Sequence, residues 1–493
     1  MLNSLTKYED ILISVIKEAQ KHNVEFVEAR FHSTWNLVAI LNNGKSEPSI
    51  SSETQGIGIR IIYDGVMIFA SINSYDSIPQ LIEKSISTAK SSKKLSKNPI
   101  KFSSEKSINK TWAAEEKENL KNVNIDEMIS ELNNIDEYVK SFSSDVSFPK
   151  RTLILSNSIE EKFYINSEGS RILSRVPRVE FHSYLAAKTN GSLSAISIPA
   201  GYAGLGGTGG WETIKTFNFD SYIPEQLKNS SKSITSKLVK FDNDVDVIVG
   251  PEIAGIVAHE SCGHPFEADR ILGREAAQAG ESYLDFDSVE KKFNFGTIEE
   301  IDKSEAFVSD DPTLSGSMGF YLFDDEGVEA HKRTLLQGGI VTDLLHNRET
   351  SFQKDIQSNA SSRSVDYDRE PIIRMSNTFI EPGDYDFEEL VADIKYGIYI
   401  KNFMEWNIND TREHQKYVGL EAYLIKNGIK DVNVKSPVLE LTAKKFWSSI
   451  DGRSKTLKFS SATCGKGEPM QGAPVWTGGP HVRLRNLRVG SHS

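Results

Sequence analysis

Residues 245–269 read VDVIVGPEIAGIVAHESCGHPFEAD, and this stretch decides how the C-terminal half of the chain folds. Residues 245–249 are β-branched apart from one aspartate, which is typical of a buried strand. Pro251 follows at a position suited to the first turn of a helix, because a residue there needs no hydrogen-bonded N–H group. The stretch therefore predicts a strand followed by a helix, and that helix carries the residues AHESCGHPFEAD.

Three residues separate Glu260 from His264 in this helix, one more than in the familiar zinc-peptidase motif. At about 100° per residue, Glu260 and His264 share a face of a regular α-helix, whereas His259 and His264 lie roughly 140° apart. A π-type bulge brings residues i and i+5 back together, and a break at Gly263 would serve as well. We therefore expect the helix to be distorted at or before Gly263.

The histidine pair follows an apolar run, residues 253–258, which we expect to bury it. A single His-Glu pair on a core helix is most often a satisfied polar group, but burying this much polarity together without a purpose is costly. A catalytic zinc ion takes three protein ligands and keeps one position open for water, so one ligand is missing from this helix. The candidates are Glu267, Cys262 and Cys464, the last in a predicted glycine-rich loop, SSATCGKGEPMQGAP (460–474).

The composition is that of a soluble globular protein, with 493 residues of which 38% are hydrophobic and 26% charged. The net charge of −12 argues against nucleic acid as a partner. The two cysteines, Cys262 and Cys464, make a disulfide framework unnecessary, and we expect Cys262 to pack as a small apolar residue. The start of the chain lacks a signal-peptide pattern and no run of about 18 apolar residues occurs, so we expect a cytoplasmic protein without a membrane segment.

The length predicts two or three domains. In residues 1–95, apolar residues at helical spacing come first and predict a helix. Runs of alternating apolar and polar residues follow and predict strands, and the dipeptides Asn43-Gly44 and Asp64-Gly65 between them are typical of hairpin turns. A second helical face and further strands predict another α+β module in residues 96–240. Residues 241–493 form a strand-rich, mixed α/β domain with the histidine helix and the Cys464 loop. The predicted fold class is therefore α+β, an N-terminal helix and antiparallel-sheet modules followed by this C-terminal domain.

Three further motifs have simple structural explanations. GLGGTG (204–209) fits a dinucleotide-binding pattern, but no strand-turn-helix context surrounds it, so we expect a flexible loop. FDDEG (323–327) lacks EF-hand spacing, so we expect a turn and not a calcium site. His346 and Arg348 are candidates for stabilising an oxyanion, although a polar cluster at the end of a strand would contain the same residues.

HESCGHPFEAD (259–269) resembles the His-Glu-x-x-x-His motif of the TldD/PmbA family, whose TldD-type subunits are zinc metallopeptidases. The resemblance covers nearly the whole chain and is weakest between about residues 91 and 150. The other stretches that carry it occur in the right order, at 56–71, 323–351, 374–403 and 462–467.

The resemblance implies that His259, His264 and Cys464 ligate Zn²⁺ and that Glu260 is the catalytic general base. It implies a zinc-dependent peptidase that hydrolyses unfolded proteins or small peptides, with Glu260 taking a proton from water and passing it to the leaving amine. PmbA subunits, also called TldE, lack the metal motif, so the resemblance is to the TldD type. Family members act as dimers, which implies a homodimer or a heterodimer with a PmbA/TldE-like subunit.

Two segments depart from the family pattern. Pro265 and Ala268 replace leucine-containing and glycine variants, without affecting any ligand. NFMEWNINDTREHQKYVGLEAYLI (402–425) differs from the glycine-rich version of bacterial members, so the substrate channel is expected to differ there.

Two rival interpretations stay open. In the first, the chain is a non-catalytic peptide-binding or scaffold subunit with a structural zinc site, closed by Glu267 or Cys262 as a fourth ligand. Such a site has no use for Glu260 as a base. In the second, the same ligands support hydrolysis of an amide that is not a peptide.

Overall fold

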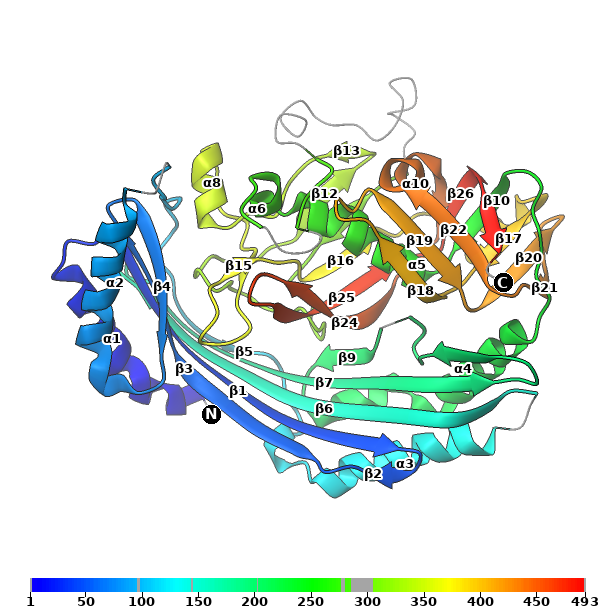
Figure 1. Cartoon of the computed structure of the whole chain (residues 1–493), viewed down its shortest axis with the longest axis horizontal. Helices are drawn as coiled ribbons and strands as arrows, with labels where there is room; N and C mark the ends of the chain where they lie inside the picture. The colour runs from blue at the N-terminus through cyan, green and yellow to red at the C-terminus, as the bar shows by residue number, and fades with distance from the viewer. Residues whose placement is uncertain are drawn as a thin grey trace.

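The computed structural model describes residues 2–94, 98–142, 145–201, 203–275, 280–284 and 305–491. A long curved sheet forms the N-terminal half, and a strand-rich C-terminal part lies against its inner face (Figure 1). Helices and largely antiparallel strands make up both halves, so the predicted α+β class is confirmed. Within the described ranges, none of the helices is both long and apolar enough to cross a membrane.

The N-terminal sheet has the strand order β4-β3-β1-β6-β7-β5, with β2, β8 and β9 paired alongside. The chain reverses at Asn43-Gly44 and at Asp64-Gly65, and all four residues have positive φ, as this type of two-residue hairpin turn requires. Both predicted turns are confirmed. The strands are β1 Phe26–Asn42, β2 Lys45–Ser46, β3 Ile50–Tyr63, β4 Val66–Ile72, β5 Asn109–Ala113, β6 Ser147–Asn166, β7 Arg171–Lys188, β8 Leu193–Ile196 and β9 Leu205–Thr208.

Helices cover the outer face of this sheet (Figure 1). α1 (Glu9–Gln20) packs on β1, α2 (Ile78–Ser92) on β3 and β4, and α3 (Ile125–Ser141) on β1 and β6. The predicted apolar faces of α1 and α3 are the faces that they bury, with Leu12, Val15 and Ala19 on α1 and Met128, Leu132 and Val139 on α3. α4 (Phe219–Ile234) packs beside α3 and leads into the C-terminal part.

The two predicted N-terminal modules share this one sheet. β1 belongs to the first and β6 to the second, and the two strands pair antiparallel from Glu28↔Asn166 to Asn42↔Thr152. Local periodicity predicts each strand but carries no information about such long-range pairing. The module boundaries near residues 95 and 240 stay a prediction.

The C-terminal part contains three main sheets, with the strand orders β21-β20-β17-β10-β26-β23, β13-β12-β11-β16-β25-β24 and β18-β19-β22-β27, and a short pair β14-β15. Its helices are α5 Pro251–Ala258, α6 Ala268–Ile271, α8 Arg348–Lys354, α9 Phe387–Ala392 and α10 Ala443–Ser449. Its strands are β10 Val245–Val249, β11 Val308–Asp310, β12 Arg333–Gln337, β13 Ile340–Val341, β14 Ser362–Arg363, β15 Ile372–Ile373, β16 Asn377–Ile380, β17 Tyr396–Ile400, β18 Phe403–Ile408, β19 His414–Gly419, β20 Ala422–Lys426, β21 Ile429–Asn433, β22 Pro437–Thr442, β23 Ile450–Arg453, β24 Lys458–Lys466, β25 Gln471–Gly479, β26 Val482–Leu487 and β27 Val489–Ser491.

The predicted strand and helix at residues 245–258 are confirmed as β10 and α5. α5 packs against β25, β16 and β24, and its apolar face, with Ile253, Ala254 and Val257 fully buried, belongs to the large apolar core of this part. The histidines follow the C-terminal end of α5. The packing of α5 therefore fixes their position relative to β24.

Cys464 lies on a strand, so the predicted glycine-rich loop is wrong at this residue. β24 and β25 form a hairpin in which Cys464 pairs with Ala473 and Gly465 with Gly472. The turn occupies only residues 467–470. The abundance of glycine favours a loop locally, but β25 is held in the sheet by β16, and pairing with it overrides that preference.

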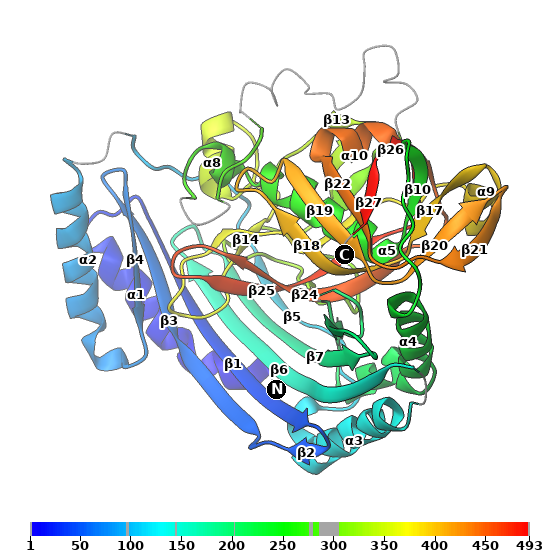
Figure 2. The same cartoon turned by 45° about the vertical axis from the view of Figure 1, so that its right-hand side comes forward.

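The segment GLGGTG contains a strand, β9, so the predicted flexible loop is also wrong. β9 pairs with β7, and Gly204 just before it bridges to Ser461 on β24. A Cβ atom on Gly204 would lie 2.8 Å from both Phe181 O and Ser461 Oγ, which explains why glycine is needed there. The contact joins the N-terminal sheet to the β24–β25 hairpin, which lies over its inner face (Figure 2).

Candidate metal centre

The helix that carries the histidines changes its winding where they occur. α5 ends at Ala258, and the chain continues as a π-helical turn, His259–Gly263, and then a 3₁₀ turn, His264–Phe266. The predicted distortion is therefore confirmed, and it combines the two forms considered: a π-helical turn ends at Gly263, and a new segment, the 3₁₀ turn, begins at His264. A Cβ atom on Gly263 would lie 1.9 Å from Met375 Sδ, so any residue but glycine requires the Met375 side chain to move.

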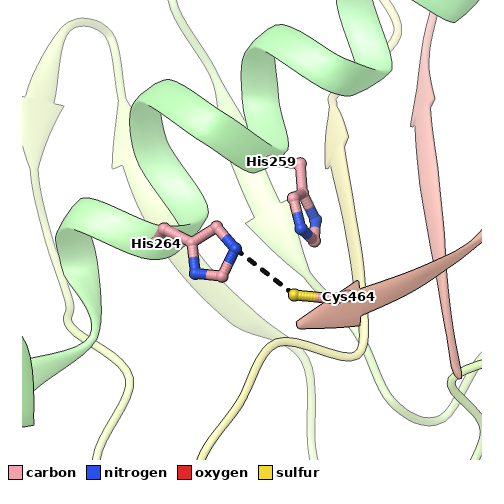
Figure 3. Close-up of side chains that lie close together, drawn as sticks. All are labelled: His259, His264 and Cys464. Atoms are coloured by element: carbon pink, nitrogen blue, oxygen red, sulfur yellow. Dashed lines mark hydrogen bonds between the residues drawn. The ribbon is translucent and has the colours of Figure 1, made fainter. Parts of the chain in front are cut away.

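The π-helical turn directs both imidazole rings toward Cys464 on β24 (Figure 3). One ligand atom from each of His259, His264 and Cys464 lies within 4.8 Å of the other two. The imidazole centroids are 4.9 Å apart, and Cys464 Sγ is 3.3 Å from His264 Nε2. All three side chains are buried. The fold thus brings together, from elements far apart in the sequence, the three residues to which the resemblance assigns the metal.

Glu267, one of the alternative ligands near the histidines in sequence, directs its carboxylate at neighbouring nitrogen atoms. Glu267 Oε2 lies 3.1 Å from His264 Nδ1, 2.5 Å from Arg270 Nε and 3.2 Å from Lys466 Nζ. Burial raises the pKa of the Glu267 carboxyl, but these neighbouring groups outweigh it and hold the pKa well below its usual range. Glu267 therefore fixes the orientation of the His264 ring, with Nδ1 toward the carboxylate and Nε2 toward Cys464.

The two cysteines differ in acidity. Burial raises the pKa of Cys464, but the two neighbouring imidazoles and Arg374 outweigh it and bring the pKa well below its usual range. Burial raises the pKa of Cys262 well above its usual range, and this residue packs in the apolar core as predicted. Because the thiolate is the form of cysteine that binds metals, Cys464 is suited to a ligand role and Cys262 is not.

Glu260 lies next to this group and contacts an arginine that the sequence reasoning missed. The Arg412 guanidinium donates through Nη1 to Glu260 Oε2, and both side chains are buried. Burial lowers the pKa of Arg412 to about 10, so the guanidinium is still cationic at neutral pH. Arg412 follows β18 in the turn before β19, inside the segment 402–425 that departs from the family pattern. That departure was the one signal in the sequence that pointed to it.

A cavity of about 260 Å³ opens onto the metal-ligating candidates and Glu260. Apolar side chains from β18 and α5 line one part of it, and residues of β24 line another. Its lining includes Ile256, Glu260, Trp406, Ile408, Arg412, Thr463, Cys464 and Gly465. The cavity therefore places a potential base, a cation and three potential metal ligands around one volume.

His346 and Arg348, the candidates for stabilising an oxyanion, lie elsewhere. His346 Nδ1 is 3.1 Å from Thr350 Oγ1 at the start of α8, and Arg348 donates to Ser103 O at 2.6 Å and to Glu168 at 3.0 Å. Neither residue is among those that line the cavity. Their polar clustering has a structural cause, since both residues help to anchor the beginning of α8.

The sequence was compared with known proteins and families. The profile of the PmbA/TldA metallopeptidase C-terminal domain matches residues 242–491, that of domain 1 matches residues 27–89 and that of the central domain matches residues 118–240. The chain is 32% identical to metalloprotease MJ0996 of Methanocaldococcus jannaschii over 475 residues, which cover 93% of this chain and 96% of the relative. The chain belongs to the PmbA/TldD metallopeptidase family.

Other relatives within the PmbA/TldD family agree with this assignment. A metalloprotease of Methanothermobacter thermautotrophicus is 29% identical, with 98% of each chain covered. The zinc metalloprotease TldD homolog of Saccharolobus solfataricus is 27% identical over 285 residues, 56% of each chain. The crystal structure of TldE from Thermococcus kodakarensis matches with a TM-score of 0.72 at 14% identity, covering 97% of this chain and 100% of that one. At that identity the structural match shows a shared PmbA/TldD fold and nothing further.

Proposed function

We propose that this chain is a zinc-dependent peptidase of the TldD type, which hydrolyses unfolded proteins or small peptides. The observation that carries the proposal is the convergence of His259, His264 and Cys464 within 4.8 Å beside Glu260, on the wall of one cavity. The names of the relatives, metalloprotease and zinc metalloprotease TldD homolog, support the same reaction class.

The chemistry of the donor set fits zinc. Two imidazoles and one thiolate are ligands that zinc prefers, and three protein ligands leave one position for water, as catalytic zinc sites do. His259 Nδ1 is buried without a hydrogen-bond partner among the described residues, which is costly unless the ring has another partner. Both observations favour an ion held by His259, His264 and Cys464.

The rival structural-zinc interpretation needs a fourth protein ligand. Glu267 is engaged by Arg270 and Lys466, and Cys262 is packed in the apolar core with a raised pKa. Glu267 Oε1 has no hydrogen-bond partner among the described residues, but neither Glu267 nor Cys262 belongs to the group whose ligand atoms lie within 4.8 Å of one another. Glu260, which lines the cavity next to the ligands, has a role in hydrolysis and none in a structural site.

In the proposed reaction, bound zinc supplies a Lewis acid that activates water and polarises the scissile carbonyl. Glu260 then accepts a proton from the attacking water while the new C–O bond forms. The same carboxyl group delivers that proton to the amide nitrogen as the C–N bond breaks, which regenerates the base. His264 is held in place during these steps by Glu267.

The edge of β24 supports binding of an extended peptide. Ser461 exchanges backbone hydrogen bonds with Gly204, so its N–H and C=O groups point away from β25. The alternation of an antiparallel ladder directs the N–H and C=O groups of Thr463 and Gly465 to the same edge, on either side of Cys464. Both residues line the cavity. A peptide that pairs with this edge would be held through its main chain, independently of its sequence.

The size of the cavity favours unfolded substrates. Its volume of about 260 Å³ is below the range of pockets for drug-sized ligands, so it suits a short piece of extended chain, which an unfolded protein or a small peptide presents readily. The same proposal includes a cytoplasmic location and a dimer, formed either by two copies of this chain or with a PmbA/TldE-like subunit. The fold shared with TldE supports such a pairing.

The proposal is tested by measuring the zinc content and peptide cleavage of the purified chain, alone and with any protein that copurifies. Glu260→Gln should retain zinc and lose at least about 10²-fold in kcat, because the proton acceptor is gone. Glu127→Gln, the same substitution at an exposed position of α3, should behave like the wild type. Cleavage by Glu260→Gln at the normal rate would overturn the mechanism, and a zinc-loaded chain that cleaves no peptide in either preparation would overturn the function.

A further inference from the structure

Arg412 occupies an unusual position, in a tight turn whose backbone is held while its side chain enters the cavity. Its φ is +63°, a left-handed conformation that non-glycine residues seldom adopt. The turn is closed by hydrogen bonds from Arg412 N to Asn409 O at 3.0 Å and from His414 N to Asn409 Oδ1 at 2.9 Å. The surrounding hairpin therefore determines where the guanidinium lies.

The side chain of Arg412 is directed into the protein and not into solvent. Only 6% of the residue is exposed, although it belongs to a polar turn between two strands. Its guanidinium contacts Glu260 and lines the same cavity as His259, His264 and Cys464. Burying a cation is costly, and a turn that only reversed the chain would leave such a residue in water.

We propose that Arg412 is a catalytic residue whose guanidinium stabilises the oxyanion that forms on the scissile carbonyl. The inference rests on the proposed function, since it concerns the same hydrolysis. It replaces His346 and Arg348, which lie outside the cavity, with a residue that lines it.

The proposal follows from how negative charge moves when water adds to the scissile carbonyl. One O–H bond of water breaks and its proton goes to Glu260, whose charge changes from −1 to zero. The C–O bond forms, and the π electron pair of the carbonyl moves to its oxygen, whose charge changes from zero to −1. The total charge beside Arg412 is therefore unchanged, with one anionic partner before the step and one after it. A cation held in place in the wall of a cavity stabilises such a developing charge better than water does, because it need not reorient as the charge forms.

Two other roles for Arg412 predict different experimental results. If Arg412 served only to hold Glu260 inactive, removing the guanidinium would release the base and raise kcat. If Arg412 only supported the turn, its loss would lower the stability or the zinc content without a selective effect on the transition state. The two alternatives are therefore separable from the proposal by experiment.

The test compares zinc-loaded wild type, Arg412→Gln and Arg412→Lys, with Lys416→Gln as the control. Lys416 lies on β19 of the same hairpin and is not among the residues that line the cavity. We expect Arg412→Gln to keep its zinc and its KM for an unfolded peptide within about 3-fold, while kcat falls about 10²- to 10³-fold. Arg412→Lys should recover part of the loss, because it restores the charge, and Lys416→Gln should match the wild type.

A second measurement does not depend on turnover. A phosphinic peptide carries a tetrahedral anion in place of the scissile amide, and isothermal titration gives its Kd directly. Arg412→Gln should weaken that Kd by a factor similar to the loss in kcat and leave the unfolding temperature within about 2 °C of the wild type. An unchanged or raised kcat, or an unchanged Kd, would overturn the proposal. If the wild type itself cleaves no peptide, the proposed function fails instead.

Discussion

His264 is the residue on which the geometry of the metal centre depends most directly. One ring nitrogen faces Glu267 at 3.1 Å and the other faces Cys464 at 3.3 Å. The carboxylate is itself held by Arg270 and Lys466, so the ring is oriented by a chain of buried contacts. Partners of this kind fix the tautomer of a histidine and increase its basicity toward a metal.

Replacing Cys464 tests whether β24 supplies the proposed third ligand. Cys464→Ser keeps the size of the side chain but removes the thiolate, so we expect the affinity for zinc to fall at least about 10²-fold. Competition with a chelator of known affinity measures the change. Cys262→Ala is the control, because Cys262 packs in the apolar core, and its zinc affinity should equal that of the wild type.

Unchanged zinc affinity in Cys464→Ser would point back to Glu267 or Cys262. Those alternatives stayed open when only the residues of the helix were considered, because sequence spacing gives no information about which distant strand lies opposite a helix. The resemblance to a family, and not periodicity, singled out Cys464. Arg412 was missed because NINDTREH resembles any solvated turn, and only the packing of the hairpin directs the side chain inward.

At the scale of elements, the distortion of the helix at the two histidines is the feature that was predicted most directly. Five positions separate the two histidines, a spacing that a regular α-helix places on different faces and a π-helix places on nearly the same one. The hairpin turns at Asn43-Gly44 and Asp64-Gly65 were predictable for a similar reason, since few sequences satisfy their positive φ angles. β9 and β24 were not predictable, because glycine-rich segments form strands only when neighbouring strands pair with them.

Gly263→Ala tests whether the packing of this turn supports the metal centre. The added methyl group would lie 1.9 Å from the sulfur of the buried Met375, so we expect a loss of stability of about 1–3 kcal/mol and a lower zinc content. Denaturant unfolding and metal analysis measure the two effects. Gly191→Ala should be neutral, because an added Cβ there has no atom within 4 Å.

The double variant Gly263→Ala with Met375→Ala shows why Gly263→Ala lowers the zinc content. The cause is either a steric clash with Met375 or a change in the backbone of the turn. Removing the methionine side chain makes room for the new methyl group, so zinc content should recover at least in part. If the double variant binds no more zinc than Gly263→Ala alone, the collision with Met375 is not the reason for the glycine.

At the scale of the whole molecule, buried ion pairs join the N-terminal sheet to the C-terminal part. Arg60 on β3 lies 2.7 Å from Glu28 on β1 and 2.9 Å from Glu326. Glu326 belongs to FDDEG, where the predicted turn is confirmed, and its other oxygen accepts a hydrogen bond from Arg348 N at 2.7 Å. Glu326 therefore serves the contact between the two halves, which the sequence did not indicate because Glu326 and Arg60 are distant in the chain.

Glu326→Gln should destabilise the protein strongly, since it leaves Arg60 with one anionic partner in a buried site. Breaking such a pair costs about 3–5 kcal/mol. Because the unfolding entropy of a chain of 493 residues is about 1 kcal/mol/K, we expect that loss to lower Tm by about 3–5 °C in a thermal scan. Lys215→Gln breaks an ion pair in which both side chains are largely exposed, and it should change Tm by less than about 2 °C. Equal effects of the two substitutions would show that the buried pair contributes no more than a surface one.

The hairpin β24–β25 also affects how the protein is assembled. His264 and Cys464 are 200 residues apart, so an ion bound by both closes a very long loop. As a crosslink, that loop would remove conformational entropy from the unfolded chain worth about 5 kcal/mol. At a synthesis rate of about 5–20 residues per second, Cys464 is added to the chain about 10–40 s after the histidines. If zinc is held as proposed, its three ligands are therefore complete only late in synthesis, and the bound ion would join segments that were made at opposite ends of the C-terminal half.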